Sequence, residues 1–270
     1  MQSVSAAAAS PETNAEQASA LILARGLSKT YVTASGAVTA LKNLNFEIYD
    51  GEFVSVVGQS GCGKSTLLKV LAGLLPYTTG SVELNGKPLR GPTPQAAVVF
   101  QSPVLLPWRT VLDNVLLPIE FRKLPMANYR KSATDLLAMV GLSEFAQRYP
   151  FELSGGMQQR TAIVRALVQD PRLLLMDEPF GALDAMTRDA LNLELQRIWM
   201  ETRKTITVVT HSIIEAVFLA DRIVLLSPRP GHIDTIYDVP FARPRPIDLQ
   251  STAPFQEIAL ALRHRLSEIS

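Results

Sequence analysis

A nine-residue stretch, GQSGCGKST at positions 58–66, constrains the fold of this chain more than any other feature. It fits the pattern G-x-x-x-x-G-K-[ST], in which glycines let backbone N–H groups approach a polyphosphate at the N-terminus of a helix. The preceding segment, EFVSVV at positions 52–57, predicts a short buried strand, and TLLKVLA at positions 66–72 predicts a helix. The sequence therefore predicts a strand, a phosphate-binding loop and a helix in succession.

The loop pattern assigns roles to individual positions. Lys64 is expected to reach the β- and γ-phosphates of a nucleotide, and Ser65 to hold Mg²⁺. The full set of residues expected to contact the nucleotide in this loop is Gly58, Gln59, Ser60, Gly61, Cys62, Gly63, Lys64, Ser65 and Thr66. Cys62 has two interpretations: a small filler whose backbone matters, or a thiol made reactive by the helix N-terminus. The second predicts that alkylation blocks nucleotide binding and that a bound nucleotide protects the thiol.

Composition limits the class of protein. With 270 residues, 47% of them hydrophobic, the chain can bury a large core in one or two domains. The net charge is +1 and no run of Lys or Arg marks a nucleic-acid interface, so no nucleic-acid partner is expected. The single cysteine excludes an intramolecular disulfide and a cysteine-based metal cluster. No apolar stretch approaches the roughly 20 residues that span a bilayer, so at a membrane another chain would have to hold this one.

The N-terminal half divides into segments that differ in their pattern of apolar residues. Residues 1–22 lack a periodic pattern and contain no Lys or Arg, so we expect a flexible leader and no targeting peptide. Alternating apolar runs at 21–32 and 38–53 predict an antiparallel β pair, and turn residues within 81–89 predict a hairpin. From about 102 to 158 the periodicity becomes helical and is broken by prolines. This predicts a helical subdomain inserted into a β-rich chain.

Beyond the insertion, predicted strands alternate with predicted helices, which favours a mostly parallel α/β sheet. The expected strands are 172–176, 205–210 and 222–227, and the expected helices are 161–170, 187–203 and 213–221. Ligands of open α/β sheets bind at the carboxyl ends of the strands. The polar residues that follow predicted strands are Gln101, Asp177, Glu178 and His211.

Two adjacent acids follow the strand at 172–176. Asp177 is expected to be the metal-side carboxylate, because Mg²⁺ prefers oxygen ligands shared between protein and phosphates. Glu178 is expected to polarise an attacking water as general base. The alternative, a solvated turn, is disfavoured because the preceding apolar residues would bury the spot. His211 alone could equally be structural, but its position at a strand end places it beside the γ-phosphate. His232 and His264 lack such a context and are expected at the surface.

Five ordered motifs together resemble the ATP-binding subunits of ABC transporters over about residues 23–227. They are the phosphate-binding loop, LSGGMQQR at 153–160, LLLMDEP at 173–179, GALD at 181–184, and His211. LSGGMQQR is the most specific, since most other P-loop families lack it. The resemblance implies an α/β P-loop NTPase fold with a RecA-like parallel core, an antiparallel β subdomain and an inserted helical subdomain, followed by a C-terminal extension at 228–270.

The resemblance also implies residue roles. Tyr31, for which spacing alone predicts strand packing, becomes the aromatic on which adenine stacks. Gln101 becomes a catalytic and metal-side residue that couples the nucleotide and its Mg²⁺ to the helical subdomain. His211 becomes the contact to the γ-phosphate. The catalytic residues are then Glu178, His211 and Gln101, and the metal-side residues are Ser65, Gln101 and Asp177.

The motif LSGGM makes physical sense as half of a shared site. Ser154, Gly155 and Gly156 at a helix N-terminus form a second anion site, although the chain already has one complete phosphate-binding loop. In the family, two subunits pair head to tail around two ATP molecules with Mg²⁺, so a homodimer is expected. Met157 and Ser212 depart from the usual Gln and Asp, but neither position is assigned to catalysis. We therefore expect active hydrolysis, with Lys64→Ala losing nucleotide binding and Glu178→Gln trapping an ATP-bound dimer.

Segments 100–121, 176–191 and 228–246 resemble the importer subgroup for nitrate, sulfonates and taurine. This implies an ATPase that is peripheral on the cytoplasmic face of the inner membrane. It would drive uptake of a small anion through integral membrane permease subunits, with a substrate-binding protein as an indirect partner. The apolar surface at Pro107, Trp108 and the following helix would receive a coupling helix of the permease. The alternative there is a self-contained core turn.

Two other functions remain to be weighed. A soluble ABC-type ATPase acting on nucleic acid or in translation usually carries two ATPase halves or a long coiled-coil insertion, and this chain has neither. A P-loop small-molecule kinase would leave LSGGM unexplained. The transported substrate is not encoded in such a subunit, because the binding protein and permease contact it.

Overall fold

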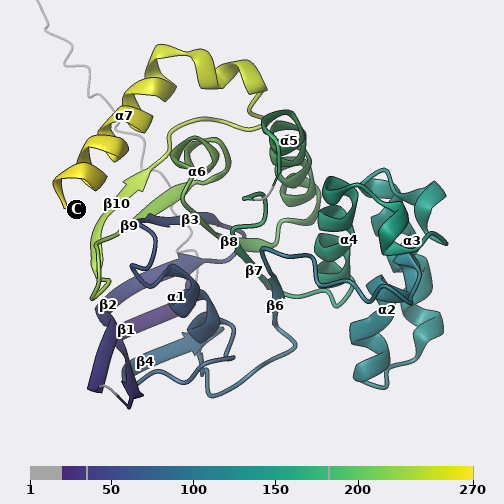
Figure 1. Ribbon diagram of the computed structural model, residues 1–270, viewed down its shortest axis with the longest axis horizontal. Coiled ribbons are helices and arrows are strands. Elements are labelled where there is room, and N and C mark those ends of the chain that lie inside the picture. The colour runs from purple at the N-terminus through teal and green to yellow at the C-terminus, as the bar shows by residue number, and fades with distance from the viewer. Residues whose placement is uncertain (1–19, 35, 182, 270) are drawn as a thin grey trace, which may run out of the picture.

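The computed structural model describes residues 20–34, 36–181 and 183–269. Two sheets and a group of helices at one side form the molecule (Figure 1). The expected leader falls mostly on residues 1–19, outside the described residues. The predicted end of the leader, at about residue 22, is too late, because β1 begins at Ala20 and both Leu21 and Ile22 are buried.

The core is a six-stranded sheet in the order β10-β9-β3-β8-β7-β6. Its strands are β3 (Phe53–Gly58), β6 (Ala96–Val99), β7 (Leu173–Asp177), β8 (Thr205–Thr210), β9 (Arg222–Leu226) and β10 (Ile233–Asp238). All neighbours are parallel except β10, which runs antiparallel to β9. The parallel strands read as nearly continuous apolar runs because both faces of the sheet are covered.

Alternate residues of each core strand face two different hydrophobic cores. On β3, Phe53 and Val57 belong to the core that contains α4, α5, α6 and α7, while Val54 and Val56 belong to the core around α1. The helices are α1 (Lys64–Leu71), α4 (Gly155–Leu167), α5 (Ala185–Thr202), α6 (Ile213–Leu219) and α7 (Ala253–Glu268). This division follows from the period of two in a strand, and it confirms the predicted parallel α/β core.

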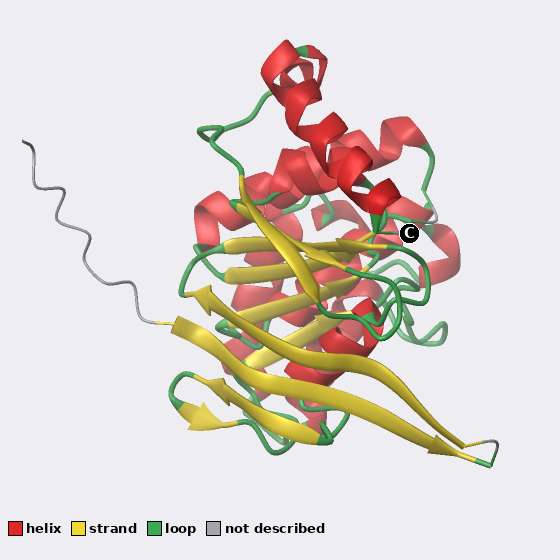
Figure 2. Ribbon diagram, turned by 90° about the vertical axis from the view of Figure 1, so that its left-hand side faces the viewer, coloured by secondary structure: helices red, strands yellow, loops and turns green. Residues whose placement is uncertain are grey.

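A second, antiparallel sheet packs against the far side of α1, as Figure 2 shows from the side. Its order is β2-β1-β4-β5, with β1 (Ala20–Thr33), β2 (Gly36–Tyr49), β4 (Thr79–Leu84) and β5 (Lys87–Pro88). The predicted β pair is confirmed by the β1–β2 ladder, and the predicted hairpin by β4 and β5. Because α1 lies between the two sheets, the segment entering it is held from both sides.

The helical subdomain lies beside β6 and β7 (Figure 1). It contains α2 (Val111–Phe121), α3 (Met126–Met139), the 3₁₀ turns η1 (Ser143–Phe145) and η2 (Pro150–Glu152), and the start of α4. The Thr110 side chain caps α2 by accepting the N–H of Asp113 at 3.1 Å. Since α4 packs on both α2 and β6, it connects this subdomain to the core sheet.

Residues after 227 join the core. β10 adds an edge strand, and η3 (Ile247–Ser251) leads into α7, whose Phe255 and Leu262 are fully buried. Arg245 is 1% exposed and donates to the carbonyls that end α6, those of Val217, Phe218 and Ala220. None of the described helices meets the length and apolarity needed to cross a bilayer.

Candidate nucleotide-binding site

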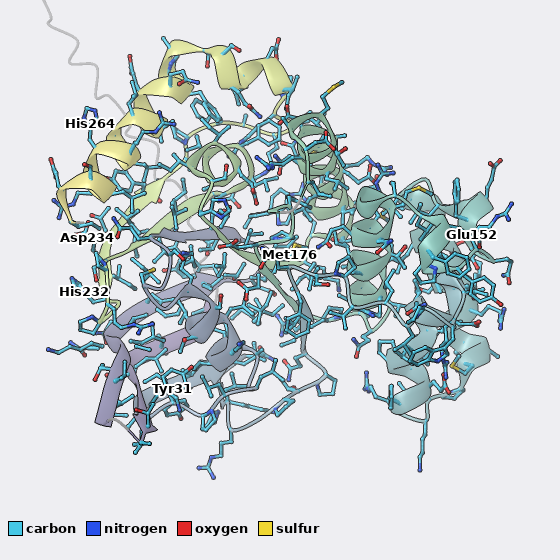
Figure 3. All side chains as sticks on the ribbon, viewed as in Figure 1. Tyr31, Glu152, Met176, His232, Asp234 and His264 are labelled. Atoms are coloured by element: carbon cyan, nitrogen blue, oxygen red, sulfur yellow. The ribbon has the colours of Figure 1, made fainter. Side chains whose placement is uncertain are left out.

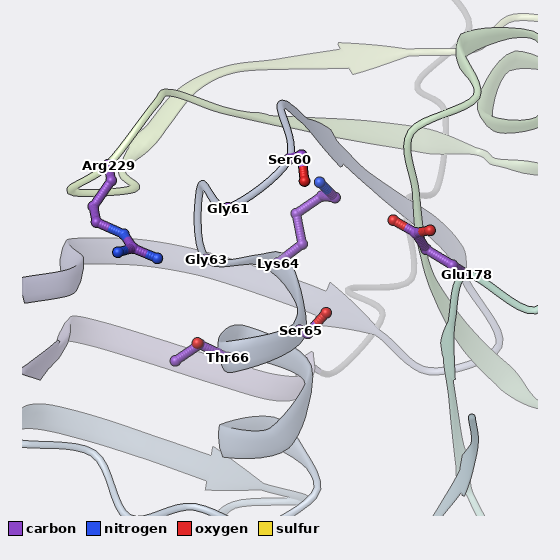
Figure 4. Close-up of a pocket in the computed structure, with 8 residues that line it drawn as sticks. All are labelled: Ser60, Gly61, Gly63, Lys64, Ser65, Thr66, Glu178 and Arg229. Atoms are coloured by element: carbon purple, nitrogen blue, oxygen red, sulfur yellow. The ribbon is translucent and has the colours of Figure 1, made fainter. Parts of the chain in front are cut away.

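The predicted loop connects β3 to α1 and lines a pocket (Figure 4). The lining residues are Ser60, Gly61, Gly63, Lys64, Ser65, Thr66, Glu178 and Arg229. The helix begins at Lys64, two residues earlier than predicted, because Gly63 forms its N-cap with φ 115°. A Cβ at Gly63 would also lie 2.9 Å from the carbonyl oxygen of Ala40. Only glycine satisfies both conditions, so the glycine pattern corresponds to real backbone constraints.

Lys64 carries the positive charge of the loop. Its side chain is almost buried, at 5% exposure, and Nζ donates to the carbonyl oxygens of Gly58 at 2.8 Å and Gln59 at 2.9 Å. These bonds keep the ammonium group under the loop, where it adds to the field of the α1 N-terminus. The pocket is therefore suited to a polyanion.

Cys62 lies on the inner side of the loop and is 1% exposed. Burial raises the pKa of its thiol, and the opposing charge of Lys64 is the smaller effect. The thiolate is the reactive form, so burial argues against the interpretation of Cys62 as a reactive thiol. The structure supports the filler interpretation, because Sγ of Cys62 occupies the space beside Gly58. A Cβ on Gly58 would lie only 2.8 Å from this sulfur.

Ser65 and Asp177 meet across the pocket floor. Ser65 Oγ donates to Asp177 Oδ1 at 2.9 Å, which joins the start of α1 to the end of β7. The pKa of Asp177 is raised, chiefly by burial and further by the charge of Glu178. A hydroxyl and a carboxylate oxygen in contact form a donor set that suits Mg²⁺ once phosphate oxygens and water complete the shell. A bound cation would reverse the pKa shift by favouring the carboxylate.

Two predicted residues from other strand ends lie near Glu178, which lines the pocket. Glu178 follows β7, with Oε2 3.2 Å from Nδ1 of His211, which follows β8. A Cβ on Gly181 would lie 3.5 Å from both Glu178 Oε2 and Gln101 Nε2, so Gln101 stands at the same place from the end of β6. Glu178 has φ 44°, an uncommon value for a side chain with a Cβ. The structure thus brings together Gln101, Glu178 and His211.

Tyr31 reaches the same pocket from β1. Its hydroxyl lies 3.2 Å from Oγ1 of Thr66, and its ring is partly exposed with Lys29 Nζ 5.2 Å from the centroid. The ring is therefore not part of a closed core, which leaves a face free for a planar ligand. By contrast, His232 and His264 are exposed, as predicted, and lie toward the outer edge of the molecule (Figure 3).

Residues 154–156 lie outside the nucleotide pocket of their own chain. Ser154 caps α4 by accepting the N–H of Met157 at 3.3 Å, and it is exposed, as is Gly155. Gly156 is buried, because a Cβ there would lie 2.9 Å from Thr187 Cγ2 on α5. None of these three residues lines the pocket. The structure does not bring the second anion site to the loop of the same chain.

Two residues near the pocket were missed by sequence reasoning. Arg229 lines the pocket from the turn between β9 and β10. Glu215, on the first turn of α6, is 4% exposed and accepts a hydrogen bond from Thr210 Oγ1 at 3.3 Å. Thr210 also accepts the N–H of Ser212 at 3.0 Å, so Glu215 supports the backbone on both sides of His211. Neither residue had a usable signal in the sequence, because Glu215 is one charged residue in an apolar helix and Arg229 lies in a Pro- and Gly-containing turn.

This fold and pocket define a P-loop nucleoside triphosphatase. The sequence pattern of the ABC transporter family matches residues 41–181. The chain belongs to that family.

The relatives are similar over most of the chain. The bicarbonate transport ATP-binding protein CmpD of Synechocystis sp. is 45% identical, covering 86% of this chain and 84% of its own length. The taurine import ATP-binding protein TauB of Rhizobium johnstonii is 47% identical, covering 76% and 79%. The nitrate import ATP-binding protein NrtD of Synechococcus elongatus is 44% identical, covering 80% of each.

A solved structure agrees with the fold. The dimeric ATP-binding cassette MJ0796, in a post-hydrolysis state bound to ADP and Pi, superimposes with a TM-score of 0.71 at 34% identity, covering 82% of this chain and all of that one. The predicted ABC-type ATPase and its fold class are thereby confirmed.

Proposed function

We propose that two copies of this chain bind two MgATP head to tail and hydrolyse them to drive import of a small anion through membrane permease subunits. The observation that carries the nucleotide part is the gathering of Gln101 and His211 around Glu178, which lines the pocket together with the loop. The shared site is supported by the exposed Ser154 and Gly155, which lie outside their own chain's pocket.

The chemistry is divided among the pocket residues. Lys64 and the backbone N–H groups of the loop bind the phosphates, while Ser65 and Asp177 would hold Mg²⁺, which would neutralise charge on the phosphates. Glu178 accepts a proton from the attacking water, and His211 Nδ1 lies 3.2 Å from its Oε2.

Dimerisation completes the site. Residues 154–156 present free N–H groups and a hydroxyl at the start of α4, a geometry that suits the γ-phosphate of a nucleotide in a second copy. The dimeric MJ0796 cassette, described with ADP and Pi, supports this arrangement. Closure on ATP and opening after hydrolysis would then transmit a movement to the permease.

The importer assignment rests on the relatives and on one surface. Relatives at 44–47% identity are named for bicarbonate, taurine and nitrate transport, all small anionic or zwitterionic solutes. On the helical subdomain, Trp108 is 70% exposed, Phe121 79% and Val104 59%. The exposure of Trp108 argues against the alternative of a self-contained core turn. Exposed apolar side chains of this size suit a partner surface, and we assign it to a coupling helix of the permease at the cytoplasmic face of the membrane.

The test is uptake in the organism of origin. Deletion of the gene should abolish uptake of one among labelled taurine, nitrate and bicarbonate. The wild-type gene should restore uptake, and the Glu178→Gln variant should not. Unchanged uptake of all three anions, together with ATPase activity that is stimulated by nucleic acid, would refute the importer and favour a soluble ABC-type ATPase.

A further inference from the structure

The turn between β9 and β10 packs directly on the phosphate-binding loop. Gly231 N donates to the carbonyl of Ala40 at 2.9 Å, and Lys42 N donates to the carbonyl of Gly231 at 2.9 Å. A Cβ on Gly231 would lie 2.2 Å from the carbonyl oxygen of Cys62. Because no other residue fits this approach, the turn is held at a fixed distance from the loop by β2 and by the loop itself.

Arg229 is the side chain that this turn presents to the pocket. It is exposed, and it lines the pocket together with Lys64 and Thr66. Its charge also lowers the pKa of the Cys62 thiol, opposing the larger effect of burial, so the guanidinium acts on the loop electrostatically. Within the described residues no hydrogen bond or ion pair occupies this guanidinium. Its donors are therefore free to bind a ligand in the pocket.

The position of Arg229 in the pocket indicates which part of a nucleotide it meets. In Figure 4 its guanidinium lies on the Thr66 side of the loop, whereas Glu178 lies on the opposite side, with Lys64 between them. Tyr31 contacts the Thr66 side through its hydroxyl at 3.2 Å. Because Glu178 is proposed to activate the water that attacks the γ-phosphate, we assign the opposite, Thr66 side to the α- and β-phosphates.

We propose that Arg229 binds the α- and β-phosphates of the nucleotide, as a second cation beside Lys64. A guanidinium forms paired, charge-assisted hydrogen bonds with phosphate oxygens, which an ammonium does not reproduce. Because ADP retains both phosphates, Arg229 stabilises the ATP and ADP complexes equally. This proposal rests on the nucleotide site proposed above.

The experiment measures nucleotide affinity by calorimetry on the full chain. For Arg229→Ala, the Kd of MgADP and that of a non-hydrolysable MgATP analogue should both rise roughly tenfold, the size expected for an exposed charge-assisted bond. The Kd values of Arg229→Lys should lie between those of Arg229→Ala and the wild type, because lysine keeps the positive charge but lacks the paired N–H donors of the guanidinium. Pyrophosphate, added as a competitor, should bind Arg229→Ala with the same, roughly tenfold lower affinity relative to the wild type.

The control is Arg263→Ala, which removes an equal charge from the exposed face of α7 and should leave every Kd unchanged. Unaltered affinity in Arg229→Ala would overturn the proposal, and a loss for the ATP analogue alone would overturn the assignment to the α- and β-phosphates. A loss for ADP without a loss for pyrophosphate would place the contact at the base or ribose and also overturn it. If the wild type binds no ADP, the nucleotide site itself is refuted. Should Arg229→Ala lower the melting temperature, Arg229→Gln repeats the test.

Discussion

Replacing Glu215 with Gln should change how the stability of this protein depends on pH. The carboxyl group is 4% exposed on the first turn of α6, and within the described residues its Oε1 has no hydrogen-bond partner. Burial raises the pKa of Glu215 to about 7, the charge of Glu178 adds to the shift, and Thr210 and Arg188 oppose it. The native state therefore keeps a proton that the unfolded chain releases.

The direction and size of this pH effect follow from the coupling between proton binding and folding. Because the native pKa is raised from 4.5 to about 7, the folded state binds the extra proton between these values, and stability falls as pH rises through that window. At 1.36 kcal/mol per pKa unit, ionising Glu215 in the folded protein costs about 3 kcal/mol. Glu215→Gln carries no charge at any pH and avoids this loss.

The assay is urea unfolding of both proteins at pH 5, 6, 7 and 8. The free energy of unfolding of Glu215→Gln, relative to that of the wild type, should increase by roughly 2–3 kcal/mol from pH 5 to pH 8, because part of the loss in the wild type has already occurred at pH 5. Glu144→Gln, on the exposed turn η1, serves as the matched control and should follow the wild type. Parallel pH profiles for Glu215→Gln and the wild type would refute the buried, neutral carboxyl group.

Four further predictions follow from the burial, exposure and hydrogen bonds of other residues. Lys64→Ala should abolish measurable MgATP binding in calorimetry, because the loop loses its buried cation. Arg245→Ala should lower the free energy of unfolding by roughly 3 kcal/mol in urea titrations, since the buried carbonyls at the end of α6 lose their donor. Cys62 in the native protein should react with iodoacetamide far more slowly than after unfolding, with or without MgATP, because it is buried. Trp108→Glu should reduce the fraction of the protein recovered with membranes of the native host, because it places a charge on the exposed apolar surface.

The elements and most of the site could be predicted because their signals are local. The loop at 58–66 specifies its own backbone, and apolar runs that end in Asp177 or His211 identify strand ends that meet at one edge of a parallel sheet. Contact between Glu178 and His211 then follows from topology, since β7 and β8 are neighbours. The order of motifs along the chain therefore predicts which residues meet, whereas the role of each residue remains a prediction.

What could not be predicted depends on contacts between distant segments. Arg229 reaches the loop only because Gly231 fits against Cys62 and pairs with β2, and no sequence pattern marks that approach. The burial of Cys62 has the same origin, and this is why a helix N-terminus alone suggested a reactive thiol. Glu215 was overlooked because one charged residue in an apolar helix is indistinguishable, in sequence, from a solvated one.

The most direct test of the account is the mass in solution of Glu178→Gln, determined by light scattering. With MgATP this variant should be a dimer that retains two ATP molecules, and with MgADP it should be a monomer. Adding Ser154→Arg, at the exposed start of α4, should prevent the dimer while each monomer still binds ATP. A Glu178→Gln protein that stays monomeric when saturated with ATP would contradict the shared site, and one that hydrolyses ATP at the wild-type rate would contradict the role of Glu178 as general base.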